Sequence, residues 1–282
     1  MVHTLRGVVS FAILFCYTLV GCASVYVLAL AQLLCPVPHW RRRIRGANDD
    51  VITAWVFLNE KMCHLFRWIR IESTLPNNLA TRKDWWIIAS NHQSWADIVI
   101  LEIVFRKLAP PIKFFTKREL IWVPFLGFGL WLLRFPYVRR GKREKGQSRQ
   151  QVQHKNRQEL QRAERQFHER PISLLLFLEG TRFTPVKHAQ QRPVYQHLLR
   201  PKLGGLAFSL EALADDVDRI VNVTVNYEGA VPGFWQFLCG RCSHVSVHVE
   251  TIPLTASFNQ NLKKEVMKLW EEKDHVLSTM RS

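Results

Sequence analysis

Residues 85–97 read WWIIASNHQSWAD, and this stretch decides how the rest of the sequence is interpreted. Its apolar run, 85–89, is typical of a strand buried in a sheet. Residues 90–93 are polar, and a helical pattern of apolar residues then continues to about Phe105. Polar side chains directly after a buried strand lie where open α/β sheets bind their ligands. The stretch therefore predicts an α/β fold with a functional site at the end of this strand.

His92 and Asp97 are the candidate reactive pair in this stretch. Their spacing places them on different faces of a continuous helix, so they meet only if His92 lies in the turn before the helix. Ser94 is a favourable N-cap residue, which makes Asp97 the third helical residue and supports that geometry. An aspartate bonded to one imidazole nitrogen leaves the other nitrogen as a general base. Ser94 and Asp97 also match a capping box, so this motif alone favours a structural role.

A second polar motif follows a second strand. Residues 173–178 (SLLLFL) are the clearest strand of the sequence and lead into Glu179, Gly180, Thr181 and Arg182. Glycine lets a ligand approach the backbone closely, arginine offers a planar fork for phosphate, and threonine adds a hydroxyl. Glu179 is placed to orient the guanidinium of Arg182 or a substrate hydroxyl. The alternative is a polar turn with a surface ion pair, which contributes little.

The remainder of the chain continues the α/β pattern. Further strands are expected at 112–115, 220–225 and 245–249, and an amphipathic helix at 259–276. Residues 73–282 are therefore expected to form one domain, a mixed sheet flanked by helices.

The N-terminal segment is apolar. Residues 7–40 contain no Lys, Arg, Asp or Glu, an uncharged run of 34 residues that is long enough as a helix to cross a bilayer. Pro36 and Pro38 are expected to end that helix, and the basic cluster 41–45 is typical of a cytoplasmic flank. We predict a transmembrane anchor with a basic flank over 1–45. A cleaved signal peptide is the alternative, but its apolar region is about half as long.

Two other segments are candidates for membrane contact. An amphipathic helix is predicted over 46–72, capped at Asn48, with apolar residues at helical spacing through 48–70. It is expected to pack against the first helix or to lie in the membrane interface, although an ordinary surface helix is nearly as compatible with the pattern. Residues 120–133 are uncharged but too short to span, and are either core or a second membrane-contacting surface.

Composition and charge limit the class of protein. The chain has 282 residues, 48% of them hydrophobic, which excludes a disordered chain. It has 39 Lys and Arg against 23 Asp and Glu, a net charge of +16, which indicates anionic partners such as phospholipids, phosphorylated substrates or nucleic acid. Residues 139–170 carry 11 basic residues and 4 Glu, a net +7, and are expected to form a long solvated helix that attracts anionic lipid.

The six cysteines do not indicate a metal site. Cys239 and Cys242 form a single C-x-x-C pair near His244, and zinc requires a fourth ligand at suitable spacing. Reduced cytosolic thiols are expected, and no metal is assigned.

The two polar motifs together resemble the glycerolipid acyltransferases, the 1-acylglycerol-3-phosphate O-acyltransferase or PlsC-like family. Residues 91–97 (NHQSWAD) and 177–184 (FLEGTRFT) are most similar to the subgroup of lysocardiolipin-type acyltransferases and bacterial YihG-type inner-membrane proteins. The loop 201–205 (PKLGG) also resembles that subgroup and is expected to line the site. Residues 220–225 take the place of a block that usually reads Val-x-Pro-Val, with Asn222 where proline is common.

The resemblance implies transfer of a fatty acyl group from acyl-CoA or acyl-carrier protein to a 1-acylglycerol-3-phosphate-type lysophospholipid. It implies that His92 deprotonates the acceptor hydroxyl and that Asp97 orients His92. The residues implied to bind the acceptor's glycerol phosphate are Glu179, Gly180, Thr181, Arg182, Arg139 and Arg140. No cofactor and no nucleic-acid partner are implied, and the enzyme is expected at the cytoplasmic face of the inner membrane with a single or re-entrant anchor.

Other functions stay open at this point. The acceptor can be another lysolipid, such as lysophosphatidylglycerol, a lysocardiolipin or an aminoacyl lipid. A different class is a non-catalytic tether whose basic helix holds anionic lipid or nucleic acid at the membrane. Serine hydrolase, P-loop nucleotidase and zincin functions lack their motifs.

Overall fold

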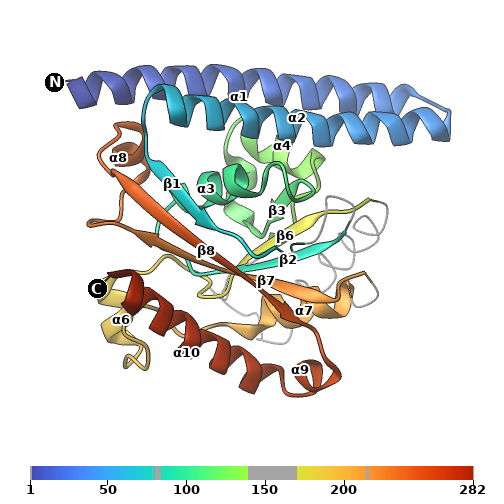
Figure 1. Cartoon of the computed structure of the whole chain (residues 1–282). Coiled ribbons are helices and arrows are strands. Elements are labelled where there is room, and N and C mark those ends of the chain that lie inside the picture. Colours follow the sequence, from blue (N-terminus) through green and yellow to red (C-terminus); the bar gives the residue numbers. More distant parts are fainter. Residues whose placement is uncertain (1, 78, 80–83, 139–169, 214–215, 282) are drawn as a thin grey trace, which may run out of the picture.

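Figure 1 shows the computed structural model, in which two long helices lie across an α/β domain with helices on both faces of its sheet. The structure describes residues 2–77, 79, 84–138, 170–213 and 216–281. The predicted fold class, a mixed sheet flanked by helices with an N-terminal apolar helix, is confirmed. The solvated basic helix predicted at 139–170 lies outside the described residues, apart from Arg170.

The first two helices form a pair. α1 (Val2–Leu34) contains most of the uncharged run, and α2 (Pro38–Leu65) folds back and packs along it. The predicted start of the second helix at Asn48 is wrong, because α2 begins at Pro38. Proline suits the first turn of a helix, where its missing N–H loses no partner. The basic residues 41–45 therefore lie inside α2. The prediction that this second helix packs against the first one is confirmed.

The main sheet has six strands in the order β1-β8-β7-β2-β6-β3, and β7 and β8 are the antiparallel pair. The predicted strands are confirmed with shifted ends. The strands are β1 (Arg70–Thr74), β2 (Trp86–Ser90), β3 (Ile112–Phe114), β6 (Ser173–Phe177), β7 (Arg219–Tyr227) and β8 (His244–Pro253). Because β6, β2 and β7 are adjacent and parallel, their carboxyl ends meet at one edge of the sheet.

The edge strand β1 was missed. It occupies residues that were assigned to the end of the predicted 46–72 helix, which in fact ends at Leu65. The chain reverses at Arg67, whose φ of 46° is in the left-handed region. β1 is largely exposed and only Ile71 is partly buried. Its strand conformation therefore comes from pairing with β8, in which Ile71 lies opposite Val245. Such long-range pairing leaves little local signal.

Helices cover both faces of the sheet. α3 (Ala96–Phe105) lies between one face and the α1–α2 pair, where the larger apolar core is found. On the other face, a second core packs against α10 (Leu262–Arg281), which confirms the predicted closing helix but begins and ends later. The remaining helices are α6 (Pro185–Gln190), α7 (Leu203–Ala212), α8 (Phe234–Leu238) and α9 (Ala256–Gln260).

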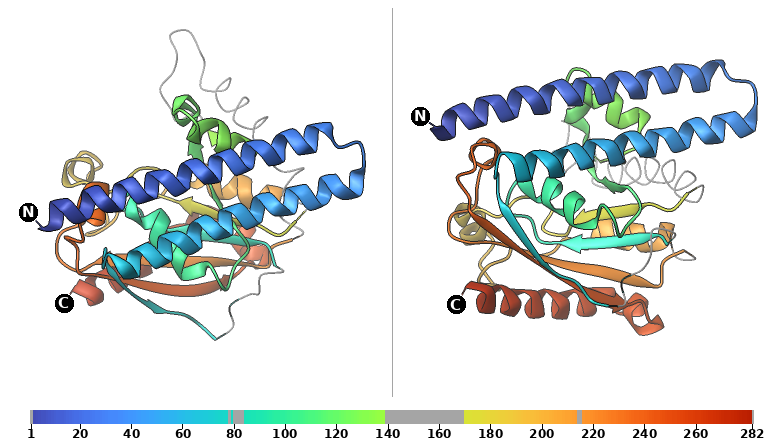
Figure 2. Two further views of the ribbon diagram at one scale, coloured as in Figure 1. Left: turned by 90° about the horizontal axis from the view of Figure 1, so that it is seen from above. Right: turned by 45° about the horizontal axis from the view of Figure 1, so that its top comes forward.

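Residues 120–133 form part of a small subdomain beside α1. A 3-10 helix, η1 (Arg118–Trp122), and α4 (Leu126–Leu132) follow the first strand of a two-stranded sheet. That sheet pairs β4 (Thr116–Lys117) with β5 (Tyr137–Val138). Gly127 and Gly129 are buried, whereas most of the large apolar side chains of this subdomain face outward. Leu130 and Leu133 pack against a small apolar core cluster, so the segment is partly core. Most of its other large apolar side chains are exposed on a subdomain that lies beside α1, as the ribbons in Figure 2 show.

Candidate active site

His92 and Asp97 meet in the way that their spacing requires. His92 lies in the turn after β2, and its Nδ1 is 2.8 Å from Oδ2 of Asp97 near the start of α3. Asp97 is fully buried, whereas the His92 side chain is 12% exposed. Because Nδ1 is held by the carboxylate, Nε2 is the nitrogen that is left to accept a proton. The predicted contact between the imidazole and the carboxylate is therefore confirmed.

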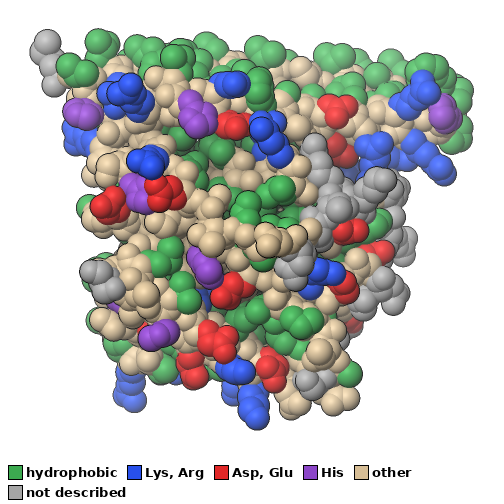
Figure 3. Space-filling view, in the orientation of Figure 1, with side chains coloured by type: hydrophobic (Ala, Val, Ile, Leu, Met, Phe, Trp, Pro, Cys, Tyr) green, Lys and Arg blue, Asp and Glu red, His purple; other side chains and the backbone are tan. Residues whose placement is uncertain are grey.

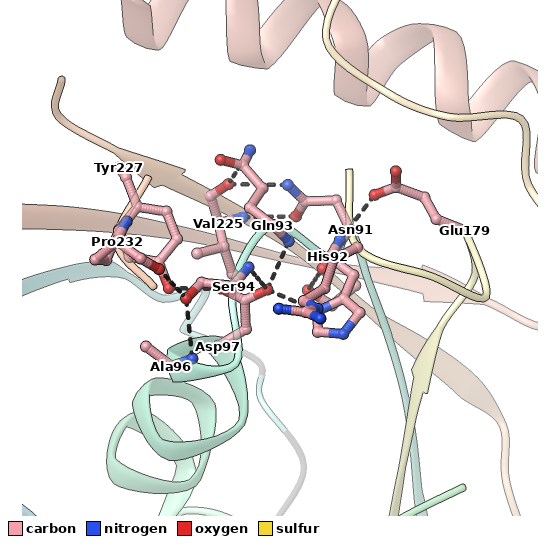
Figure 4. A network of polar contacts seen from close by, with 12 residues as sticks. Asn91, His92, Gln93, Ser94, Ala96, Asp97, Glu179, Val225, Tyr227 and Pro232 are labelled. Atoms are coloured by element: carbon pink, nitrogen blue, oxygen red, sulfur yellow. Dashed lines mark hydrogen bonds and ion pairs between the residues drawn. The ribbon is translucent and has the colours of Figure 1, made fainter. Parts of the chain in front are cut away.

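The Asp97 carboxylate also organises the turn that carries His92 (Figure 4). Its Oδ2 accepts hydrogen bonds from the backbone N–H groups of Gln93 (2.7 Å) and Ser94 (2.9 Å). Its Oδ1 accepts a hydrogen bond of 2.5 Å from the hydroxyl of Tyr227, at the end of β7. Burial and this carboxylate raise the pKa of Tyr227 well above its usual value, so the phenol stays protonated and donates. Asp97 therefore both fixes the backbone of the turn and contacts the His92 imidazole.

The prediction that Ser94 is the N-cap residue is wrong by one position. α3 begins at Ala96 with Trp95 at its N-cap position. The Ser94 hydroxyl donates to the carbonyl of Pro232 at 2.5 Å and accepts from the N–H of Ala96 at 3.1 Å. The contact with the loop after β7 is long-range. It holds Ser94 before the start of α3, although serine favours the N-cap position.

The second motif holds the backbone of His92 from both sides. Glu179 Oε1 accepts the N–H of His92 at 2.7 Å, and the N–H of Phe183 donates to the His92 carbonyl at 2.7 Å. The imidazole itself stacks on the ring of Phe177 with centroids 3.9 Å apart. Motif residues far apart in sequence therefore form a single site at the carboxyl ends of β2 and β6.

The side chain of Glu179, which was predicted to bind the acceptor, is directed into the protein. Its side chain has no exposed surface, and its second oxygen accepts the backbone N–H of Leu199 at 3.0 Å. Burial raises the pKa of Glu179 to about 8. Both oxygens accept backbone N–H groups, so Glu179 acts as a positioning residue that ties the His92 turn to the 195–200 loop.

Gly180, Thr181 and Arg182 lie at the surface of the site. Gly180 has a φ of 67°, and a Cβ there would lie 2.9 Å from the Lys202 side chain. The Lys187 ammonium donates to the Thr181 hydroxyl at 2.9 Å. Arg182 is exposed, and its guanidinium lies 5.0 Å from the centre of the Trp95 ring. Three cations therefore gather around the turn, which is what a phosphate requires.

Arg139 and Arg140 lie outside the described residues. Cys239 and Cys242 are buried and form no disulfide. Within the part of the chain that the structure describes, no group of three or more His, Cys, Asp and Glu side chains is placed to hold a metal.

Three residues of the site region were missed by sequence reasoning. Tyr227 is the last residue of β7, and Lys187 is in α6. Lys273 of α10 is fully buried, donates to the carbonyl of Val223, and has its pKa lowered to about 7 by burial, while the nearby Glu179 acts in the opposite direction. The signal for Tyr227 is its position at the end of a strand parallel to the strand before His92. Lys187 and Lys273 lie in ordinary helical patterns, which do not indicate a place in the site.

An apolar cavity of about 350 Å³ opens beside the site. Trp95 forms part of its wall, and the rest comes from α1, α2, α3, α4 and α8 and from the loops around them. The lining is almost entirely hydrophobic, which suits a hydrocarbon chain. The site thus combines a fixed imidazole, a cluster of cations and an apolar cavity.

Such a combination is typical of an enzyme that acts on a substrate with anionic and apolar parts. The family model described as "Acyltransferase" matches residues 70–226, which is more than half of the chain. The chain belongs to this acyltransferase family, and the prediction that it is an acyltransferase is confirmed.

Similar proteins agree with this membership. The mouse 1-acyl-sn-glycerol-3-phosphate acyltransferase epsilon is 24% identical over 285 residues, which cover 92% of this chain and 75% of the mouse protein. A probable 1-acyl-sn-glycerol-3-phosphate acyltransferase 5 of Arabidopsis thaliana is 23% identical, covering 100% and 75%. The crystal structure of PlsC from Thermotoga maritima has a TM-score of 0.52 at 15% identity, covers 97% of this chain and 98% of PlsC, and shares the fold.

Proposed function

We propose that the chain transfers a fatty acyl group from a thioester, acyl-CoA or acyl-carrier protein, to the free hydroxyl of a 1-acylglycerol-3-phosphate. The observation that carries the proposal is the His92–Asp97 contact of 2.8 Å, which orients an imidazole beside both a cation cluster and an apolar cavity. The family and the names of the similar proteins support the same substrate class. A lysocardiolipin or lysophosphatidylglycerol acceptor would use the same groups, and a panel of lysolipids distinguishes them.

In this mechanism the chain's own residues supply the base and the binding groups. Nε2 of His92 takes the proton of the acceptor hydroxyl as its oxygen attacks the thioester carbonyl carbon. The carbon–sulfur bond then breaks, and the departing thiolate receives that proton from the imidazolium, which Asp97 stabilises. The acceptor phosphate binds Arg182, with Lys187 and Lys202 beside it. No covalent acyl-enzyme is needed, because the thioester is already activated.

Arg182→Ala tests the assignment of the phosphate. We expect the KM for 1-acylglycerol-3-phosphate to rise by about 10- to 100-fold, because a hydrogen bond to a charged group contributes about 1.5–3 kcal/mol. The KM for the acyl donor should change little. Initial rates with each substrate varied in turn measure both constants.

Arg219→Ala is the matched control, since Arg219 is at the amino end of β7, away from the site, and pairs with Asp218. It should leave both constants unchanged. A larger effect of Arg182→Ala on the donor than on the acceptor would assign this motif to the donor instead.

We also propose that the protein binds one face of a membrane through α1 and the 118–132 subdomain. Large apolar side chains are exposed along α1 and at Trp122, Phe125 and Trp131, and Figure 3 shows hydrophobic side chains along the edge that α1 forms. Clusters of exposed apolar side chains of this kind mark sites of protein or membrane interaction.

The contacts of α1 favour an orientation along the membrane rather than across it. α1 touches the rest of the chain from His3, which bonds the Cys239 carbonyl, to Tyr26, which bonds the Phe125 carbonyl. These two residues are about 35 Å apart along the helix. That length exceeds the ~30 Å hydrocarbon core, so a crossing α1 would draw the α/β domain into the bilayer. α1 is long and apolar enough to cross a bilayer, and we propose that it instead lies in the membrane interface.

Trp122→Glu combined with Phe125→Glu tests this interface. We expect binding to vesicles of phosphatidylethanolamine and phosphatidylglycerol to fall by at least tenfold, because each charge opposes insertion of the apolar face. Sedimentation with the vesicles measures the bound fraction. Val194→Glu makes the same kind of change at an exposed position near α6, far from α1, and should not alter binding. Equal binding by the double variant would remove this subdomain from the membrane contact.

A further inference from the structure

The apolar cavity beside Trp95 is lined by two residues, each with a buried polar atom that lacks a hydrogen-bond partner among the described residues. Oε2 of Glu102, on α3, and Nδ2 of Asn59, on α2, are buried and have no hydrogen-bond partner among the described residues. Both residues line this cavity. Glu102 is 5% exposed and Asn59 is 1% exposed. A buried polar group without a partner costs roughly 1–3 kcal/mol, so a group that satisfies both atoms would be bound favourably.

Two polar side chains next to these residues have partners. The Tyr17 hydroxyl donates to Oδ1 of Asn59 at 2.6 Å, which holds the amide and leaves Nδ2 as its free donor. The Trp55 indole N–H donates to the Thr18 hydroxyl at 3.0 Å. Glu102 and Asn59 are therefore distinguished from the other polar residues of the same wall by their missing partners.

Glu102 is suited to an uncharged ligand. Burial raises its pKa to about 8, so at neutral pH the carboxyl group is mostly protonated and needs no counter-ion. A neutral carboxyl group both donates and accepts, while the Asn59 amide nitrogen donates. A hydroxyl group suits each of these groups, since it can accept from the amide and can donate to or accept from the carboxyl group.

The place of Glu102 along α3 gives the position of that hydroxyl on a bound chain. Trp95 is at the amino end of α3, beside Arg182, and Glu102 is seven residues further along the same helix. At 1.5 Å per residue the two lie about 10 Å apart along the axis. A chain that enters at Trp95 therefore reaches Glu102 near its middle rather than at its carbonyl end.

We propose that Glu102 and Asn59 select acyl chains that carry a hydroxyl group in mid-chain. This inference rests on the proposed acyl transfer and names the donor class of the same site: a thioester of a mid-chain hydroxy fatty acid. The hydroxyl accepts a hydrogen bond from Nδ2 of Asn59 and bonds Oε2 of Glu102. Most of the remaining wall contacts the hydrocarbon on either side of it.

Competition between donors of equal length tests the inference. With 1-acylglycerol-3-phosphate as acceptor, stearoyl-CoA competes with 3-, 10- or 12-hydroxystearoyl-CoA, and the products are measured by mass spectrometry. We expect a 10- or 12-hydroxy chain to be preferred by about tenfold, since an apolar cavity without these groups would disfavour it. The 3-hydroxy chain should gain nothing. Glu102→Leu and Asn59→Leu should each lower the preference at least fivefold.

Asn48→Leu is the matched control. Asn48 is also on α2, and its Oδ1 is also buried without a partner among the described residues, but it does not line this cavity. It should keep the preference. A wild-type preference for stearoyl-CoA, or a hydroxyl preference that survives Glu102→Leu, would overturn the inference.

The cavity proposal can be tested even if the proposed acyl transfer fails. If no acyl donor is used, the acyl-transfer proposal fails, whereas the cavity is still tested by calorimetry of 12-hydroxystearate and stearate binding to the wild-type chain. Tighter binding of the hydroxy acid that is lost in Glu102→Leu would support the site. Equal binding of the two acids would overturn it.

Discussion

Replacing His92 by alanine is expected to lower acyl transfer to 1-acylglycerol-3-phosphate by about 10²- to 10⁴-fold, the usual contribution of a general base. The loss should appear in kcat, because His92 contacts the reacting hydroxyl and not the phosphate. The side chain is partly exposed and packs on Phe177, so its removal should leave the fold intact. Initial rates with purified protein in detergent, together with the thermal unfolding midpoint, measure the two effects.

His275→Ala provides the control for this prediction. His275 is exposed on α10, and its removal should change neither the rate nor the unfolding midpoint. A His92→Ala protein that retains more than about a tenth of the wild-type kcat would exclude His92 as the base. Loss of vesicle binding together with activity would instead indicate that the substitution damages the whole protein.

Asp97→Asn is expected to affect both activity and stability. The Asp97 carboxylate accepts four hydrogen bonds, and a carboxamide must direct its NH₂ group at some of the same donors. Each buried donor left unpaired costs roughly 1–3 kcal/mol. His92 also loses the partner that fixes its tautomer, an effect of about 10³- to 10⁴-fold on kcat. Denaturant unfolding and initial rates measure these changes.

Tyr227→Phe separates the two roles of Asp97. It removes one hydrogen bond to Oδ1 and leaves the His92 contact on Oδ2 in place. We expect a loss of about 1 kcal/mol in unfolding free energy and a reduction of no more than about tenfold in kcat. If Asp97→Asn were no worse than Tyr227→Phe, the carboxylate would serve the fold and not the orientation of His92.

The local parts of the fold and of the site were predictable. The strand before His92 is a continuous apolar run, and α3 follows an uninterrupted helical pattern, so both were placed within a residue or two. The His92–Asp97 contact joins residues five positions apart, and a strand followed by a turn and a helix restricts how so short a segment can fold. Arg182 was likewise placed beside the site by its position after the second strand.

The parts that failed depend on distant segments. β1 forms because β8 is beside it, and Glu179 turns inward because Leu199 and His92 offer backbone N–H groups. Neither an exposed strand nor a buried carboxylate can be recognised from the few residues on either side of it in the sequence. The start of α2 was missed for another reason: proline both ends and begins helices, and the sequence near Pro38 allows either.

For this protein, the sequence alone determined the α/β class, the apolar N-terminal helix, and the pair of motifs that place an imidazole and a guanidinium after two strands. The tertiary structure decided that Glu179 accepts the backbone N–H of His92 and that the Tyr227 hydroxyl donates to Asp97. It also decided that α1 packs along α2 and beside the α/β domain. It also placed Glu102 and Asn59 on one cavity wall. The reason is physical: backbone preferences and side-chain periodicity act within a few residues, whereas burial and hydrogen-bond partners are set by segments that meet only after folding.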